Sequence, residues 1–218
     1  MPLGFIPGGR TNVLPRALGL PRDPVTAARH LSESLAEERT RTISLGRANG
    51  RRFAFASGVG FDAELLRRLE TRGRTRDGKL AGDLTVAWLL VRYLSSKPKD
   101  APELEIEGIG RARSILVANA DPYTYAGRLG MRLVPGGGFD RDLALVAAVD
   151  IGSRKVVSSA FRSVTGRPPV GDVLTAQDLA RIEVGCDGPL PLHVDGEDLG
   201  DVEHVLFESE PDAVCVLI

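Results

Sequence analysis

The sequence has few aromatic residues and almost no cysteine. Aromatic side chains make up 5% of the 218 residues, so we do not expect the stacked aromatic platform with which many proteins bind nucleic-acid bases. The two cysteines, Cys186 and Cys215, are too few for a disulfide framework and lack the CxxC spacing of a zinc site. Both lie in apolar, strand-like runs, which indicates buried free thiols in a reducing, cytosolic compartment.

Long hydrophobic runs and an excess of charge are also absent. No segment approaches the ~18 consecutive apolar residues that a membrane-spanning helix requires, and the N-terminus lacks the pattern of a secretory signal. The formal net charge of −1 argues against a nucleic-acid-binding surface covering the molecule. We therefore expect a cytoplasmic protein that binds no nucleic acid and makes at most peripheral contact with the inner face of the membrane. Its length and its 43% hydrophobic content are typical of one or two globular domains.

The first 38 residues predict a strand, a glycine turn and two helices. Residues 3–6 are apolar, the turn follows at residues 7–12, and helices are expected at 13–20 and 24–38. Asp23 can cap the second helix, with Pro24 at its first position. A strand at residue 3 has no partner within this segment. We therefore expect residues 1–38 to be the remnant of an N-terminal α/β nucleotide-binding domain whose earlier part is absent, and residues 39–218 to form a second domain.

After residue 38 the pattern changes to short strands, and Asn49-Gly50 predicts a tight hairpin because both residues tolerate positive φ. Residues 57–61 are interpreted as a second glycine turn and 175–180 as a connector, and helices are expected at 62–72, 80–94 and 153–164. The pattern predicts an α+β fold: a mainly antiparallel β-sandwich or curled sheet with a few helices, plus a short βα remnant. Its remaining strands are expected at residues 42–45, 52–56, 104–107, 114–119, 131–134, 143–149, 182–186, 190–194, 202–208 and 213–217.

The turn at residues 7–12 is a candidate phosphate site. Backbone N–H groups converge where a strand leads through glycines into a helix, and the turn adds a hydroxyl and an amide. The candidate ligand-binding residues are Gly8, Gly9, Thr11 and Asn12. The alternative is a tight connection with no ligand. The Gly-Lys-Ser/Thr of a P-loop is absent.

Asp195-Gly196-Glu197 places two carboxylates on one turn between β segments. Neighbouring carboxylates repel each other unless a cation or hydrogen-bond donors neutralise them, and Mg²⁺ with nucleotide phosphates is a natural partner. The alternative is a solvated acidic hairpin. His193, just before this turn, is interpreted as a structural histidine.

The stretch from Arg67 to Lys79 carries six basic and two acidic residues, and an apolar helix is expected from Leu80 to Leu94, including Trp88. A basic loop beside exposed apolar surface is typical of attachment to an anionic bilayer. The alternative is a solvated charge run beside a core helix.

Several segments together resemble the diacylglycerol kinase and sphingosine kinase-like lipid kinases, in particular their soluble bacterial branch. The order and the separations of these segments agree over nearly the whole chain. The segments are IPGGRTNVLPRALGLP at 6–21, FASGVGFDA at 55–63, NADPYTYAG at 119–127, LVPGGGFD at 133–140 and VDGE at 194–197.

The resemblance implies an ATP- and Mg²⁺-dependent kinase that phosphorylates a lipid hydroxyl such as that of diacylglycerol. Nucleotide would bind in a cleft between the α/β domain and the β-sandwich domain. Gly9 and Asn12 would face phosphate and ribose, Glu197 with Asp195 would lie near the metal and phosphates, and Asp140 would contact a structural metal. We expect Gly196 to contribute to the nucleotide site, Glu197 and Asp195 to be catalytic, and Asp140 and Glu197 to be the metal ligands.

The chain also departs from the family pattern. The family's earlier Gly-Gly-Asp-Gly-Thr motif is missing with its whole domain, Arg10, Thr11 and Val13 replace the usual Thr, Gly and Asp, and His193 stands where glutamine is frequent. We therefore expect a truncated lipid kinase. The alternative is a non-catalytic lipid-binding or regulatory module derived from such a kinase. A relative that phosphorylates a soluble substrate, such as a nicotinamide nucleotide, is a third reading, and homodimer formation is left open.

Overall fold

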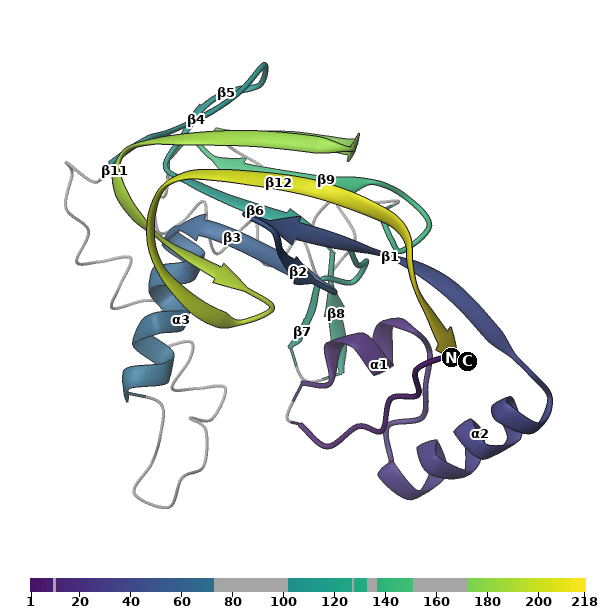
Figure 1. The fold of residues 1–218 in the computed structure, drawn as a ribbon. Coiled ribbons are helices and arrows are strands. Elements are labelled where there is room, and N and C mark those ends of the chain that lie inside the picture. Colours follow the sequence, from purple (N-terminus) through teal and green to yellow (C-terminus); the bar gives the residue numbers. More distant parts are fainter. Residues whose placement is uncertain (10, 73–101, 127, 133–136, 151–171) are drawn as a thin grey trace.

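The computed structural model describes residues 1–9, 11–72, 102–126, 128–132, 137–150 and 172–218 (Figure 1). The loop expected at 73–79 and the helices expected at 80–94 and 153–164 lie outside these ranges. The helices are α1 (Val13–Ala17), α2 (Pro24–Ala36) and α3 (Phe61–Arg72). The strands are β1 (Thr40–Ala48), β2 (Arg51–Phe53), β3 (Ala56–Gly60), β4 (Leu104–Ile106), β5 (Gly110–Ala112), β6 (Ser114–Ala118), β7 (Thr124–Ala126), β8 (Leu129–Met131), β9 (Leu143–Ala148), β10 (Val173–Leu179), β11 (Arg181–Val194) and β12 (Glu197–Leu217).

Ten of these strands form one antiparallel sheet. Its order is β10-β9-β6-β3-β11-β12-β1-β2, and β4 with β5 extends from β11. Strands β7 and β8 form a separate hairpin. Figure 1 shows β11 and β12 curving strongly, so that the sheet bends over on itself. The α+β fold class with mainly antiparallel strands is confirmed.

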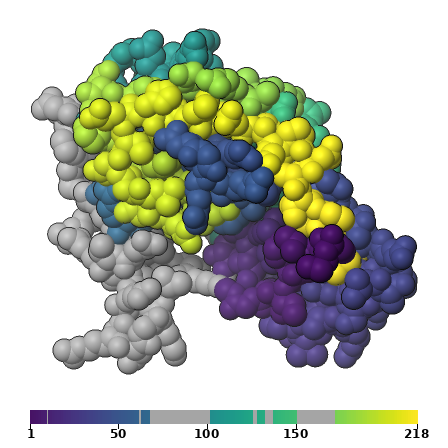
Figure 2. All heavy atoms as spheres, viewed as in Figure 1, coloured from purple at the N-terminus to yellow at the C-terminus, as the bar shows by residue number. Residues whose placement is uncertain are grey.

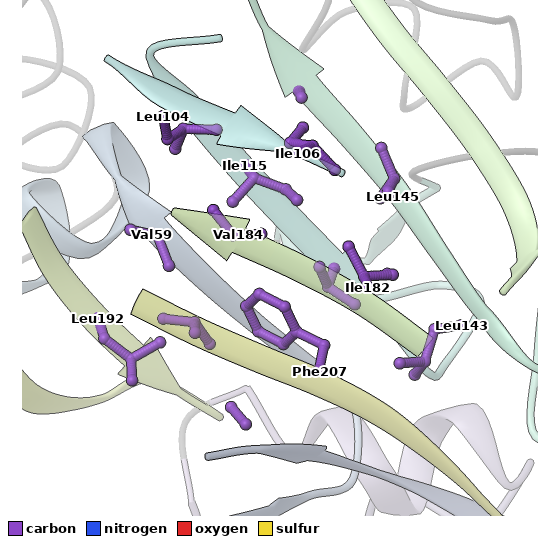
Figure 3. Packing of buried hydrophobic residues seen from close by; sticks show 14 of the residues in the cluster. Val59, Leu104, Ile106, Ile115, Leu143, Leu145, Ile182, Val184, Leu192 and Phe207 are labelled. Atoms are coloured by element: carbon purple, nitrogen blue, oxygen red, sulfur yellow. The ribbon is translucent and has the colours of Figure 1, made fainter. Parts of the chain in front are cut away.

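The hydrophobic core lies within this bend. Its largest buried side chains come from strands that are far apart in the sequence (Figure 3). Phe207 and Phe53 lie among the aliphatic residues and are both about 1% exposed or less. The other members include Val59, Leu104, Ile106, Ile115, Val117, Leu143, Leu145, Ile182, Val184 and Val205.

Two interpretations of local sequence were wrong. Residues 57–61 do not form a turn: they belong to β3 and the start of α3, and all five residues of β3 are buried. Strand β3 lies between β6 and β11. A side chain at position 58 would lie 2.8 Å from the buried His193 Nε2, so glycine here serves close packing rather than chain reversal. Residues 175–180, expected as a connector, lie mostly in the edge strand β10.

The two longest strands each join two predicted ones. β11 and β12 continue through segments that contain glycine and proline, and the pairing register shifts at these places. A register shift of this kind is a β-bulge, which accommodates residues that a regular ladder excludes. The hairpin at Asn49-Gly50 is confirmed, with φ of 47° and 81° at the two positions.

The first strand obtains its partner from the other end of the chain. Leu3 forms an isolated parallel bridge with Val216, with 2.9 Å hydrogen bonds from Leu3 N–H to the Cys215 carbonyl and from Leu217 N–H to the Leu3 carbonyl. Leu31 of α2 packs against Leu217. The two termini therefore lie side by side (Figures 1 and 2). Pairing at residues 3–6 is limited to this bridge.

The N-cap and the two thiols were also predicted from the sequence. Asp23 caps α2, because its Oδ2 accepts a 2.8 Å hydrogen bond from Thr26 N–H. Cys186 and Cys215 are free thiols, as expected, but both are only partly buried. Among the described residues, no helix is long and apolar enough to cross a membrane.

Candidate functional site

The glycine turn is closed by its own asparagine. Gly9 N–H donates to Asn12 Oδ1 at 2.8 Å, and Asn12 Nδ2 donates to the Gly9 carbonyl at 2.7 Å. Asn12 adopts the left-handed conformation with φ of 48° immediately before α1. Gly8 and Gly9 are exposed, and a side chain at Gly8 would meet nothing within 4 Å. The turn therefore presents a fixed, open backbone surface at Gly8, while the Asn12 amide is engaged in holding the turn.

The hairpin of β7 and β8 is attached to the same region by Arg16 of α1. The Arg16 guanidinium lies 3.5 Å from the centre of the Tyr125 ring, which is the geometry of a cation–π contact. Arg16 also donates to the Thr11 carbonyl and to the Arg128 carbonyl, both at 3.4 Å. Burial raises the pKa of Tyr125 above its ordinary value. Thr11, predicted as a ligand-binding residue, is thus linked to this hairpin through its carbonyl group.

Asp195 is tied to the chain that joins β2 to β3. Its Oδ2 accepts from Ala54 N–H at 2.6 Å, and its Oδ1 accepts from Phe55 and Ala56 N–H at 2.9 and 3.1 Å. Asp195 N–H in turn donates to the Ala56 carbonyl at 2.8 Å. Burial raises the pKa of Asp195, and the three backbone N–H groups oppose that shift. Both oxygens of this carboxylate therefore hold the acidic turn in place.

Glu197, two residues further on, is exposed. Its side chain is 68% accessible, and its Oε2 accepts from Arg51 of β2 at 2.9 Å. Successive residues of a strand face opposite sides, and Asp198 binds Arg67 of α3 through two hydrogen bonds of 2.6 and 2.8 Å. Glu197 is therefore directed away from α3. Gly196 adopts φ of 87°, and a side chain there would meet nothing within 4 Å.

The segment that binds the acidic turn shares a hydrophobic cluster with α1, the helix that follows the glycine turn. Residues 54–56 bind Asp195, and Phe55 packs in a cluster with Leu14 and Ala17 of α1. The buried Asn119 donates from Nδ2 to the Ala54 carbonyl at 3.1 Å and to the Ser44 carbonyl at 2.9 Å. The acidic turn and the helix that follows the glycine turn are therefore connected through residues 54–56.

Asp140 lies beside β1, and the Asp140 side chain is 72% exposed. Its Oδ2 pairs with Arg41 of β1, whereas Glu197 pairs with Arg51 of β2. Among the described residues, no group of three or more His, Cys, Asp or Glu side chains is arranged to hold a metal ion. The metal-ligand roles of Asp140 and Glu197 stay predictions.

His193 and Arg67 contribute to the architecture of this region. His193 is 3% exposed and packs over Gly58, and its carbonyl accepts from Ser57 Oγ at 2.6 Å. Arg67, the first residue of the predicted basic stretch, pairs with Asp198 and Asp201, and these hydrogen bonds raise its pKa. The part of the stretch from residue 73 to Lys79 and the helix expected from Leu80 to Leu94 lie outside the described residues.

Three residues of the region were missed by sequence reasoning: Arg16, Arg51 and Tyr125. Each obtains its place from a partner remote in sequence, since Arg51 and Glu197 are 146 residues apart. The one local signal was the position of Arg51 directly after the Asn49-Gly50 turn, which fixes it at the start of β2.

Comparison with known proteins gives a partial family match and a shared fold. Residues 1–48, which include the glycine turn, match the diacylglycerol kinase catalytic domain family. No curated protein matches the chain. The fold recurs in solved structures of bacterial proteins assigned to the same class, and the predicted resemblance to the diacylglycerol kinase-like family is confirmed.

Three solved structures similar to this chain come from Bacillus anthracis str. Sterne. One, a candidate diacylglycerol kinase, aligns with a TM-score of 0.67 and 18% identity, over 99% of this chain and 68% of its own. A second candidate diacylglycerol kinase gives 0.65 and 19%, over 99% and 69%. A diacylglycerol kinase gives 0.61 and 18%, over 99% and 66%. The chain thus spans about two thirds of the length of these structures.

Proposed function

We propose that this chain is the β-rich part of an ATP-dependent lipid kinase that transfers the γ-phosphoryl group to the hydroxyl of a diacylglycerol-like lipid. The match of residues 1–48 to a diacylglycerol kinase catalytic domain supports the class of reaction. The observation that carries the proposal is the acidic turn. It offers one exposed carboxylate, and it is hydrogen-bonded to a segment whose Phe55 shares a hydrophobic cluster with side chains of α1.

The two acids of this turn have different tasks. Glu197 is the exposed carboxylate and would contact the ligand, whereas Asp195 accepts three backbone N–H groups and would keep Glu197 in position. Phosphoryl transfer depends mainly on positioning and on neutralising charge, so a rigid turn with one available acid suits it. Gly8, Gly9, Thr11, Asn12 and Gly196 stay proposed contacts of the nucleotide.

The residues present fit Mg²⁺ that is held mainly by phosphate. Mg²⁺ keeps several waters and uses one or two carboxylates together with substrate phosphates, and the described residues offer separate acids rather than a cage. When bound, MgATP would supply the transferred phosphoryl group and the cation that neutralises its charge. Glu197 would be the carboxylate of this chain that faces the cation, and the open Gly8 backbone would face phosphate.

The lipid would be met at a membrane surface on the cytoplasmic side. Arg67 is already engaged by Asp198 and Asp201, so we propose that any contact with anionic lipid is made by later residues of the stretch ending at Lys79, together with those from Leu80 to Leu94.

The test is a phosphorylation assay of the 218-residue chain with MgATP and vesicles that contain diacylglycerol. Glu197→Ala is expected to lower turnover at least about 100-fold, because removing one charge-stabilising group costs on the order of 2.7–4 kcal/mol of barrier. The free energy of unfolding should fall by less than about 1 kcal/mol. Glu203→Ala is the matched control, since Glu203 is also an exposed acid of β12, and it should retain full turnover.

Two results would redirect the proposal. Normal turnover of Glu197→Ala would remove Glu197 from the reaction. A chain that binds the vesicles yet shows neither MgATP binding by calorimetry nor phosphorylated product would support the non-catalytic lipid-binding module instead.

A further inference from the structure

The partner of Glu197 is itself placed to bind phosphate. Arg51 Nη2 donates to Glu197 Oε2 at 2.9 Å, and the two side chains are 59% and 68% exposed. An exposed ion pair of this kind contributes about 0–1 kcal/mol to stability. Among the described residues, Glu197 is the one side chain that hydrogen-bonds to Arg51. The pair is therefore weak enough to be opened by a competing anion.

The neighbouring Arg52 makes a stronger, structural ion pair. Arg52 donates to both oxygens of Glu210, at 2.8 and 2.6 Å, and Arg47 donates to the same two oxygens at 2.9 and 3.1 Å. These contacts lower the pKa of Glu210 to about 2. Arg51, by contrast, makes a single contact through one of its five N–H donors.

Backbone geometry directs the two arginines to opposite faces. Arg51 and Phe53 share one face of β2 because alternate residues of a strand point the same way. On the face of Phe53, the exposed Arg51 reaches Glu197. On the other face, Arg52 reaches Glu210. Figure 2 shows the blue residues of this hairpin at the surface, bordered by residues of the C-terminal strands.

Both members of the pair are held by the same scaffold. Arg51 follows the tight Asn49-Gly50 turn. Glu197 follows Asp195, whose carboxylate is hydrogen-bonded to residues 54–56, just beyond β2. A guanidinium 2.9 Å from the carboxylate oxygen also repels a second cation at that carboxylate, because like charges this close disfavour each other. Glu197 can therefore accept a divalent cation only when an anion draws Arg51 away or bridges the two.

We propose that Arg51 is a phosphate-binding residue of the Glu197 site. The guanidinium leaves Glu197 for the oxygens of a nucleotide polyphosphate, and this exchange frees the carboxylate for the cation that accompanies the polyphosphate. A planar guanidinium matches phosphate oxygens with two parallel hydrogen bonds. The inference rests on the proposed kinase function and adds to it a coupling: the cation and the polyphosphate bind together, and neither binds well alone.

The experiment compares the whole chain with Arg51→Ala, Arg51→Lys and the control Arg52→Ala. The two arginines are equally exposed, at 59% and 57%, and each pairs with a glutamate. Calorimetry with MgATP and with Mg²⁺-tripolyphosphate is expected to show at least a 10-fold weaker binding for Arg51→Ala, a smaller loss for Arg51→Lys and less than a 2-fold change for Arg52→Ala. Mn²⁺ alone, followed by electron paramagnetic resonance, should bind more tightly to Arg51→Ala than to the wild type.

A merely structural role for Arg51 would not produce that rise in Mn²⁺ binding. If Arg51→Ala binds MgATP as tightly as the wild type, or Arg52→Ala loses as much affinity, the inference is wrong while the proposed function stands. A wild-type chain that binds neither MgATP nor Mg²⁺-tripolyphosphate overturns both.

Discussion

The different contacts of Asp195 and Glu197 lead to a prediction about stability. Replacing Asp195 by alanine removes the acceptor of three backbone N–H groups, at Ala54, Phe55 and Ala56. It also releases the β11–β12 turn from the chain that joins β2 to β3. Replacing Glu197 by alanine removes one exposed ion pair.

The size of the loss follows from these contacts. A hydrogen bond to a charged acceptor contributes about 1.5–3 kcal/mol, and a buried donor left without one costs about 1–3 kcal/mol. Because Ala54 and Phe55 are only half-buried, water can replace part of the loss. We therefore expect Asp195→Ala to lower the free energy of unfolding by about 3–5 kcal/mol, and Glu197→Ala by less than about 1 kcal/mol.

Asparagine at this position gives an intermediate test. The asparagine oxygen can still accept hydrogen bonds from Phe55 and Ala56 N–H. Its NH₂ group, however, would face the Ala54 N–H, a second donor, which in the wild type donates to Asp195 Oδ2. We expect Asp195→Asn to lose about 1–2 kcal/mol.

The assay is urea unfolding followed by circular dichroism, with all variants at one pH and one protein concentration. The slope of the transition should stay constant, so that differences in midpoint report stability. If Asp195→Ala unfolds within about 0.5 kcal/mol of the wild type, or Glu197→Ala is the more damaging change, the assignment of Asp195 to the scaffold is refuted.

Two further predictions concern packing and charge. Gly58→Ala should lower the free energy of unfolding by about 1–3 kcal/mol, as overpacking of a core does. The reason is that the new methyl group would lie 2.8 Å from His193 Nε2. A urea midpoint equal to that of the wild type would contradict this prediction. Glu210, whose pKa falls from 4.5 to about 2 through hydrogen bonds from Arg52 and Arg47, should stabilise the fold fully above pH 4.5 and progressively less as the pH falls toward 2. Unfolding curves of the wild type and Glu210→Gln should therefore differ by about 1 kcal/mol at pH 7 and converge in acid; a gap that widened below pH 4 would reverse the sign of the argument.

Local signals in the sequence predicted those elements whose cause is local. Asn49-Gly50 needs positive φ at both positions, and Asp23 needs only the N–H of Thr26, three residues away. Strand β3 could not be recognised in this way. Its glycines are typical of a turn, and its strand conformation comes from pairing on both sides with β6 and β11.

The length of β11 and β12 was hidden for a related reason. Gly188, Pro189 and Pro211 interrupt the alternating pattern and favour separate short strands. In the folded sheet the chain passes through these positions with a shift of register. A bulge is stabilised by the partner strand, so a single strand's composition does not reveal it.

The site was predictable in its parts but not in its contacts. The sequence identified the acidic turn, yet it could not tell which acid is buried, because the donors to Asp195 lie about 140 residues earlier. Arg51 escaped notice for the same reason. The glycine turn was recognised from the sequence. The reciprocal hydrogen bonds between Asn12 and Gly9 were not, because they depend on the left-handed conformation of Asn12.

The bridge from Leu3 to Val216 bears on how the chain is made. Synthesis proceeds from the N-terminus, and strand β1, complete at Ala48, pairs with a partner that extends to Leu217. Leu3 and the first half of β1 are therefore synthesised long before residues 214–217, with which they pair. Folding dominated by such distant pairings is slow and exposes intermediates to aggregation, so removal of residues 214–217 would leave Leu3 and the first half of β1 without their pairing partners.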